Sequence, residues 1–167
     1  DDLIIIFDTT LRDGGQTRGV DFSAADKQFI AQALDDFGID YIEGGWPGAN
    51  PTDDMFFSKD QKLKNAKLVA FGMTRRGGRS VENDPGLNAI LNAKTDATCL
   101  VGKTWDFHVT TALNIELDEN LRMITESVAA AKARGHDSMF DCEHYFDGYK
   151  ANPEYALSCV QAAHQGG

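Results

Sequence analysis

Short apolar runs alternate along the chain with stretches in which apolar residues recur at helical spacing. The first run, residues 3–8 (LIIIFD), has the length and composition of a buried strand. Residues 23–37 then place apolar groups three and four positions apart, as an amphipathic helix does. The same alternation returns along the chain. It predicts five strands, at residues 3–8, 41–45, 67–73, 96–102 and 138–144.

Helices are predicted after each of these strands. In residues 23–37 the predicted buried stripe consists of Phe29, Ile30, Ala33, Leu34 and Phe37. Further helices are predicted near 53–64, around Leu87, Ile90 and Leu91, and along Leu117, Leu121, Ile124, Val128 and Ala131. The result is a strand–helix unit that repeats without detectable sequence identity between its copies.

Capping residues support two of these helices. Ser23 is a suitable N-cap with Asp26 three residues on, and Gly38 is a natural stop. Asn152 and Pro153 have the residue types of an N-cap and a first helical position, so they predict a last helix that begins there.

Consecutive strand–helix units predict an α/β fold with a parallel sheet, which is either an open doubly wound sheet or a (β/α)8 barrel. No GxGxxG or P-loop motif follows the first strand, which disfavours the nucleotide-binding open sheets. Polar residues instead follow strand after strand, as they do at the C-terminal face of a TIM barrel. We therefore predict a TIM barrel, of which this chain supplies about the first five β/α units. The polar residues concerned are Arg12, Asp13, Glu43, Arg75, Arg76, His108, Glu143 and His144.

Length and charge narrow the possible functions. With 167 residues the chain is expected to form part of one domain, residues 1–167. A formal charge of −10 repels phosphate backbones, so we expect no nucleic-acid partner, and no apolar run approaches a membrane span in length. Three widely spaced cysteines without a CxxC motif indicate reduced thiols and a cytoplasmic protein.

The polar residues after the first strand belong to a recognisable motif. FDTTLRDGGQ, at residues 7–16, resembles the signature of the metal-dependent acyl-CoA synthases and lyases built on TIM barrels. Four further segments resemble the citramalate synthase branch of the isopropylmalate and homocitrate synthase family, and the resemblance runs from end to end. These segments are EGGWPGANP (43–51), FGMTRRGGRS (71–80), GKTWDFHV (102–109) and FDCEHYFDGYKANPEYA (140–156).

The resemblance implies a Claisen condensation of acetyl-CoA with a 2-oxo acid, in branched-chain amino-acid biosynthesis. Pyruvate, giving citramalate, is the expected 2-oxo acid. Asp13 matches the family's carboxylate ligand to a divalent metal, for which Mg2+ or Mn2+ is expected and Zn2+ or Co2+ are alternatives. Arg12 matches an arginine that stabilises the oxyanion. Gln16 resembles a polar group near the metal or its water. An ordinary surface ion pair is the structural alternative for Arg12 and Asp13.

Further candidate residues follow the later strands. Glu143 matches a glutamate near the acetyl-CoA methyl group and is assigned to the base machinery, with a structural role as the alternative. Glu43 is expected to line the substrate site, or else to bond the backbone of its own loop. His108 and His144 are candidate substrate contacts or polar core residues. Arg75, Arg76 and Arg79 form a basic cluster that is read either as a solvated loop or as a site for a CoA phosphate.

The resemblance also predicts that this chain is the N-terminal part of a longer enzyme. The family completes its metal site with a His-x-His from a later strand, and this sequence contains none. Three hypotheses follow: a citramalate-type synthase, expected to be a homodimer at full length; an isopropylmalate or homocitrate synthase or an acyl-CoA lyase of the same superfamily; or a non-catalytic half-barrel. By itself, the 167-residue chain is expected to be inactive.

Overall fold

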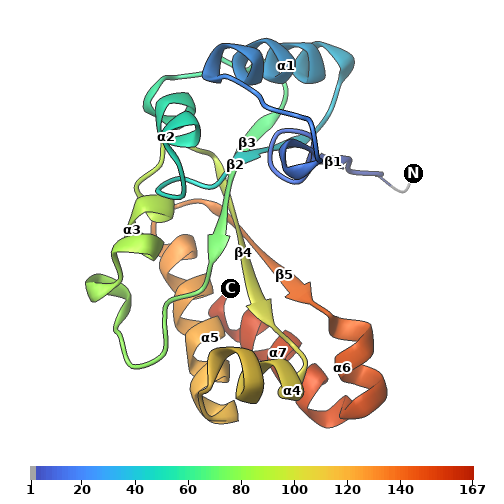
Figure 1. The fold of residues 1–167 in the computed structure, drawn as a ribbon, viewed down its shortest axis with the longest axis vertical. Helices are drawn as coiled ribbons and strands as arrows, with labels where there is room; N and C mark the ends of the chain where they lie inside the picture. Colours follow the sequence, from blue (N-terminus) through green and yellow to red (C-terminus); the bar gives the residue numbers. More distant parts are fainter. Residues whose placement is uncertain (1–2) are drawn as a thin grey trace.

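The structure of the chain is a computed structural model that describes residues 3–167. One parallel sheet has the order β1-β2-β3-β4-β5, so each strand pairs with its neighbour in the sequence. The sheet curls, and Figure 1 shows α1, α2, α3 and α5 along its outer side. The predicted TIM-barrel architecture, represented by five β/α units, is confirmed. The strands are β1 (Phe7–Asp8), β2 (Tyr41–Gly45), β3 (Lys67–Met73), β4 (Ala97–Lys103) and β5 (Asp137–Glu143).

The helices follow the strands in the predicted order. They are α1 (Ala24–Phe37), α2 (Pro51–Ser58), α3 (Pro85–Leu91), α4 (Asp106–His108), α5 (Leu117–Ala133), α6 (Tyr145–Ala151) and α7 (Pro153–Gly166). A π-helical turn at Val109–Leu113 continues α4. No helix in the part of the chain that the structure describes is long and apolar enough to cross a membrane.

The predicted caps are confirmed. Ser23 and Asp26 form a reciprocal capping box at the start of α1. Gly38 ends that helix in a left-handed conformation with φ of 96°, which favours glycine because a Cβ would be strained there. Asn152 accepts a hydrogen bond from the backbone N–H of Tyr155 at 3.2 Å, and Pro153 stands at the first position of α7.

Apolar side chains pack on both faces of the sheet. Ile42, Leu68 and Leu100 lie in the main buried cluster, together with residues of the outer helices. Val69, Ala97 and Cys99 form a smaller cluster with Phe7, Tyr41 and Met139 on the inner face. Since side chains alternate along a strand, the inner residues are every second one.

Three details of the predicted elements are wrong. Only Phe7–Asp8 of the predicted strand 3–8 pairs with β2, and the side chains of Leu3 to Ile6 are 85, 81, 57 and 49% exposed. In α1, Phe29 and Phe37 point to solvent, because the buried face carries Lys27, Ala31 and Asp35. Helix α2 ends at Ser58 rather than near residue 64, since Lys59 turns into an extended conformation. The short helices α4 and α6 were not predicted.

Candidate active site

The loop after β1 folds as a tight turn around one carbonyl group. The oxygen of Thr9 accepts backbone N–H donors from Arg12 at 3.2 Å, Asp13 at 2.9 Å and Gly14 at 3.1 Å. A single turn of 3-10 helix, Gly14–Gln16, follows at once. This turn places the side chains of Arg12 and Asp13 next to each other at the end of the strand, where the sequence predicts them.

Arg12 is held in place from two sides. Its Nε donates to Oε1 of Glu43 at 2.5 Å, and its guanidinium carbon lies 4.0 Å from the centre of the Phe71 ring. Nη1 approaches the Asp13 carboxylate at 3.6 Å. Within residues 3–167 the hydrogen bonds of the Arg12 side chain involve Nε alone. The cation is therefore fixed while its two terminal nitrogens remain available to a ligand.

Glu43 lies behind Arg12 at the end of β2 and is 1% exposed. Burial raises the pKa of the Glu43 carboxyl group, because it disfavours the charged form, and the hydrogen bond and charge of Arg12 partly oppose that rise. Glu43 therefore holds the guanidinium group of Arg12 in place. Its direct contact with a substrate stays a prediction.

Asp13, the predicted metal ligand, lies beside Arg12 with an exposed carboxylate. Its side chain is 66% exposed and is not committed to any hydrogen bond among the described residues. A carboxylate is a hard oxygen donor that suits a divalent cation. Within residues 3–167, however, no three histidine, cysteine or acidic side chains lie close enough together to hold a metal ion. The role of Asp13 as a metal ligand stays a prediction.

The loop after β2, residues 46–50, is held by a buried ion pair between α1 and α2. Lys27 is bonded to the Asp53 carboxylate and donates to the oxygen of Gly44 at 2.8 Å. Asp53 also accepts the backbone N–H of Trp46 at 2.9 Å. Position 45 needs glycine, because its φ is 148° and a Cβ would lie 2.6 Å from the Asp53 carboxylate. The ion pair thereby fixes the course of the loop.

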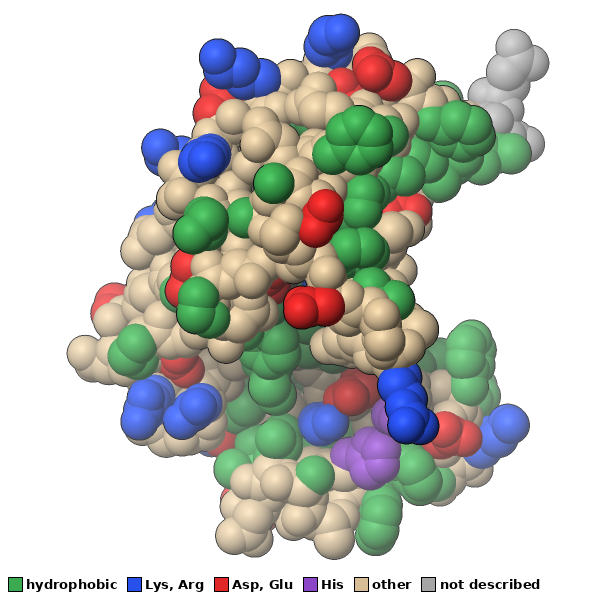
Figure 2. All heavy atoms as spheres, turned by 45° about the horizontal axis from the view of Figure 1, so that its top comes forward, with side chains coloured by type: hydrophobic (Ala, Val, Ile, Leu, Met, Phe, Trp, Pro, Cys, Tyr) green, Lys and Arg blue, Asp and Glu red, His purple; other side chains and the backbone are tan. Residues whose placement is uncertain are grey.

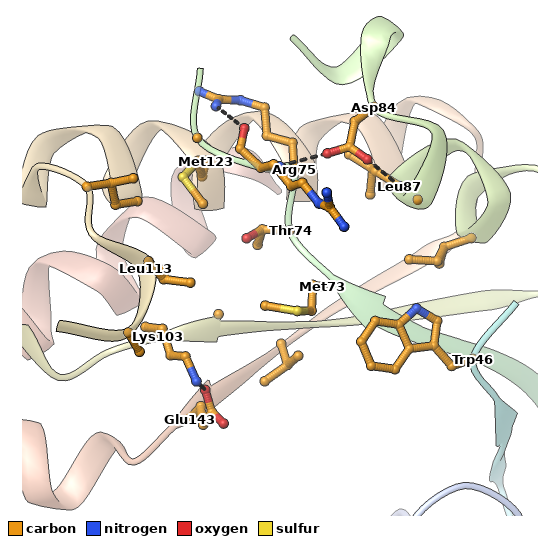
Figure 3. A pocket seen from close by; sticks show the side chains of 18 residues that line it. Trp46, Met73, Thr74, Arg75, Asp84, Leu87, Lys103, Leu113, Met123 and Glu143 are labelled. Atoms are coloured by element: carbon orange, nitrogen blue, oxygen red, sulfur yellow. Dashed lines mark hydrogen bonds and ion pairs between the residues drawn. The ribbon is translucent and has the colours of Figure 1, made fainter. Parts of the chain in front are cut away.

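Trp46, at the start of this loop, stands between two concave regions. Its ring meets Phe71 edge to face, with centroids 5.5 Å apart. On one side lies a hollow of about 370 Å³, lined by Arg12, Gln16 and the Lys27–Asp53 pair. On the other side lies a cavity of about 420 Å³ (Figure 3). Gln16 thus shares a hollow with Arg12, and its predicted place near a metal ion, its water or the substrate stays a prediction.

Glu143 lines the second cavity. Its Oε2 lies 2.5 Å from Nζ of Lys103, which stands opposite Glu143 in the β4–β5 ladder. Figure 3 shows the pair at one end of the cavity, Trp46 at the other and Met73 between them. Lys103 was not among the residues predicted from the sequence. No sequence motif identifies it, because it meets Glu143 through the β4–β5 register, which pairs the last residue of β4 with the last of β5.

His108 and His144 lie together. Their rings meet edge to face with centroids 4.8 Å apart, and the tilted ring of Trp105 lies beside His108 with centroids 4.6 Å apart. His144 Nδ1 is 3.2 Å from Asp147, and its backbone is left-handed with φ of 53°. These two rings line neither cavity described above. Figure 2 shows acidic, basic and histidine side chains gathered in the hollowed side of the molecule.

Comparison with known proteins assigns the chain to a family. The model of the HMGL-like family matches residues 3–167, which is nearly the whole chain. This chain belongs to the HMGL-like family.

Relatives of the HMGL-like chain include two synthases. It is 55% identical over 166 residues to the (R)-citramalate synthase of Aquifex aeolicus, covering 98% of this chain and 31% of that protein. It is 50% identical over 170 residues to the (R)-citramalate synthase of Streptomyces coelicolor, covering all of this chain and 32% of that protein. The chain therefore spans about a third of the length of the curated relatives that it matches.

A solved structure supports the fold of the HMGL-like chain. Hydroxymethylglutaryl-CoA lyase from Pseudomonas aeruginosa superimposes with a TM-score of 0.71 at 17% identity. The match covers 98% of this chain and 55% of the lyase. At this level of identity the likeness concerns the fold alone.

The basic cluster of the HMGL-like chain does not act as one group. Arg75 is buried, and it forms ion pairs with Glu119 at 2.7 Å and Glu126 at 2.6 Å. The reading of Arg75 as part of a solvated loop is wrong, because its charge is neutralised inside the protein by two carboxylates of α5. Arg76 and Arg79 are exposed, and Arg76 also lines the larger cavity.

The cysteines of the chain are all free. Burial raises the pKa of the Cys99 and Cys159 thiols to about 12, so both stay protonated at neutral pH. Cys142 is partly buried, and burial raises its pKa as well. None of the three thiols has the lowered pKa of a nucleophilic cysteine.

Proposed function

We propose that this chain contributes the first strands and loops of the active site of an acyl-CoA-dependent synthase. The reaction proposed is the condensation of acetyl-CoA with pyruvate to give citramalate. The observation that carries the proposal is the 55% identity to an (R)-citramalate synthase across 98% of the chain. The fixed cation at Arg12 agrees with it, because such a condensation develops negative charge on one oxygen.

Arg12 would stabilise that charge on the keto oxygen of the 2-oxo acid. The guanidinium is always charged, and Glu43 and Phe71 hold it before any substrate arrives. A donor that is already oriented needs no reorganisation at the moment of reaction. Glu43 then acts on the reaction through Arg12.

Asp13 would supply one ligand to a divalent metal ion, with Mg2+ or Mn2+ proposed. A divalent ion bound there would polarise the 2-oxo acid as a Lewis acid. The exposed carboxylate of Asp13, next to the terminal nitrogens of Arg12, supports this position. Gln16, in the same hollow as Arg12, would orient the 2-oxo acid or a water molecule.

Glu143 would accept a proton from the acetyl methyl group of acetyl-CoA. Its side chain lies at the wall of a cavity whose other lining residues are largely apolar, such as Met73, Val101 and Leu113. An apolar wall suits a thioester and its methyl group, and a carboxylate there is a suitable general base. His108 and His144, which lie against each other and do not line this cavity, are proposed as further substrate contacts.

The proposal is tested by measuring release of CoA from acetyl-CoA by the full-length natural protein. Pyruvate, 3-methyl-2-oxobutanoate and 2-oxoglutarate are compared as acceptors, each with and without Mg2+ or Mn2+. We expect pyruvate to give the highest kcat/KM. Preference for a larger 2-oxo acid would indicate isopropylmalate or homocitrate synthase-type specificity. Cleavage of a hydroxyacyl-CoA without any condensation would replace the synthase by a lyase.

The biological setting of this activity is proposed on the same basis. Citramalate formation would serve branched-chain amino-acid biosynthesis, and the three free thiols agree with a cytoplasmic location. A homodimer is proposed for the full-length protein. Its molecular mass in solution, measured by light scattering, tests that assembly.

A further inference from the structure

Lys103 and Glu143 form an ion pair at the ends of two neighbouring strands. Their Cα atoms are partners in the β4–β5 register, and Nζ lies 2.5 Å from Oε2. The two side chains are 19% and 35% exposed, so the pair is partly withdrawn from water. Both line the cavity of about 420 Å³, and Figure 3 shows them joined at one end of it.

The backbone beneath this pair is anchored by the helices outside the sheet. The oxygen of Lys103 accepts a hydrogen bond from Nδ2 of Asn120 at 2.9 Å. Asn120 is fully buried, and its Nδ2 also lies 3.0 Å from the hydroxyl group of Tyr155. Thr104 Oγ1 donates to the oxygen of Glu143 at 2.6 Å. The Cα positions of both residues are therefore fixed, and the remaining freedom lies in the side chains.

A glutamate side chain needs a partner to hold one orientation. Holding the side chain in one rotamer costs conformational entropy, which a favourable contact must offset. Precise placement matters, because a displacement of a catalytic group by about 1 Å can lower the reaction rate by about 100-fold. The ammonium group of Lys103 removes that freedom by binding one carboxylate oxygen. The other oxygen, Oε1, is left to act on a ligand in the cavity.

We propose that Lys103 is a positioning residue, which holds the Glu143 carboxylate at the cavity wall in the orientation that removes the methyl proton. This role rests on the proposed function, in which Glu143 is the base. Lys103 itself need not contact the reacting atoms. The pair explains why a lysine is placed among the apolar residues that line this end of the cavity.

The test compares Lys103→Met with Lys103→Arg in the full-length protein. Methionine keeps an unbranched apolar side chain but has no charge, whereas arginine keeps the charge and can bind a carboxylate. We expect Lys103→Met to slow exchange of the acetyl-CoA methyl protons into deuterium oxide by about 10- to 100-fold, with the KM for pyruvate within about twofold. Lys103→Arg should restore most of the exchange. The exposed Lys94, changed to methionine, is the matched control and should leave exchange unchanged.

A second readout reports on the pair without any catalysis. Acetic anhydride acetylates accessible amines, and mass spectrometry gives the rate at each lysine. We expect Lys103 to react more slowly than Lys94 in the wild type, and to gain reactivity in Glu143→Gln while Lys94 does not. Equal reactivity of Lys103 in the wild type and in Glu143→Gln would contradict the ion pair between Lys103 and Glu143 and overturn the proposed role of Lys103.

The outcomes separate this role from the proposed function. An active wild type whose Lys103→Met variant exchanges methyl protons at the normal rate would overturn the role of Lys103 alone. A fall in Lys103→Met that Lys103→Arg does not restore at all would also overturn it, since a charge is then not what matters. A wild type that neither exchanges methyl protons nor condenses acetyl-CoA would overturn the proposed function, and this role with it.

Discussion

At the scale of single residues, Arg12 and Asp13 show which features of the site a sequence motif predicts and which it does not. The two residues are consecutive in the sequence after the first strand, and their side chains lie together in the structure as predicted. What holds Arg12 could not be predicted, because Glu43 and Phe71 reach it only through the pairing and curl of β1, β2 and β3. The Lys103–Glu143 pair depends in the same way on the β4–β5 register. Sequence reasoning identifies the functional groups, while strand register decides which of them meet.

Replacing Arg12 by lysine tests the role of the fixed cation. Lysine keeps the charge but lacks the planar guanidinium that Glu43 and Phe71 hold, so the donor at the oxyanion is lost. In the full-length protein we expect turnover to fall by about 100- to 1000-fold, with metal binding unchanged. Steady-state kinetics and metal titration measure the two effects. Turnover close to that of the wild type would remove Arg12 from the mechanism.

At the scale of elements, helix α1 also has contacts that its own sequence pattern does not predict. Its helical period and capping residues predict its position, but apolarity is a poor guide to its buried face. Lys27 and Asp35 are buried because partners neutralise them or bond to them. Asp35 accepts backbone N–H donors from residues 64–66 at 2.6–2.8 Å. Burial alone would raise the pKa of Asp35, but these donors lower it overall. Such partners come from distant segments, and a periodic pattern cannot reveal them.

Asp53→Asn should loosen the loop that carries Trp46. The change leaves the buried ammonium of Lys27 without its counter-charge, and breaking a buried pair from one side costs about 3–5 kcal/mol. We expect a lower midpoint in urea unfolding of the full-length protein, followed by tryptophan fluorescence.

Asp36→Asn serves as the control for this change. Asp36 lies in α1, the helix that carries Lys27, and its side chain is 68% exposed, so its replacement should alter the free energy of unfolding by less than about 0.5 kcal/mol. If Asp53→Asn and Asp36→Asn unfold at the same urea concentration, the Lys27–Asp53 pair does not stabilise the loop.

At the scale of the whole molecule, the curled sheet determines which strand edges and apolar side chains are exposed. Repeated strand–helix units and the polar ends of the strands are local features, so the barrel class could be predicted from the sequence. The exposure of the first predicted strand could not be predicted from the sequence, because burial of a strand depends on neighbours on both of its sides. Within residues 3–167, β1 and β5 each pair on one side only. Leu3 to Ile6 consequently expose apolar side chains next to an open sheet edge.

A protein limited to these 167 residues should therefore self-associate and be catalytically inactive. Open edges can pair with other chains, and each apolar side chain left exposed forgoes about 1.5–3 kcal/mol of burial. Size-exclusion chromatography and an assay for citramalate measure both properties. Ile5→Lys, which places a charge on the edge, should reduce association. A monodisperse, active monomer would contradict this account of the half-barrel.

The central claim is that Asp13 and Glu143 perform separate tasks in one condensation. The most direct measurement follows pyruvate binding in the presence of Mg2+ and methyl-proton exchange of acetyl-CoA in Asp13→Ala and Glu143→Gln variants of the full-length protein. We predict that Asp13→Ala abolishes metal-dependent binding of pyruvate. Glu143→Gln should bind pyruvate normally but suppress exchange, because the amide cannot accept the proton. Normal exchange in Glu143→Gln, or unchanged metal-dependent binding in Asp13→Ala, would contradict the account.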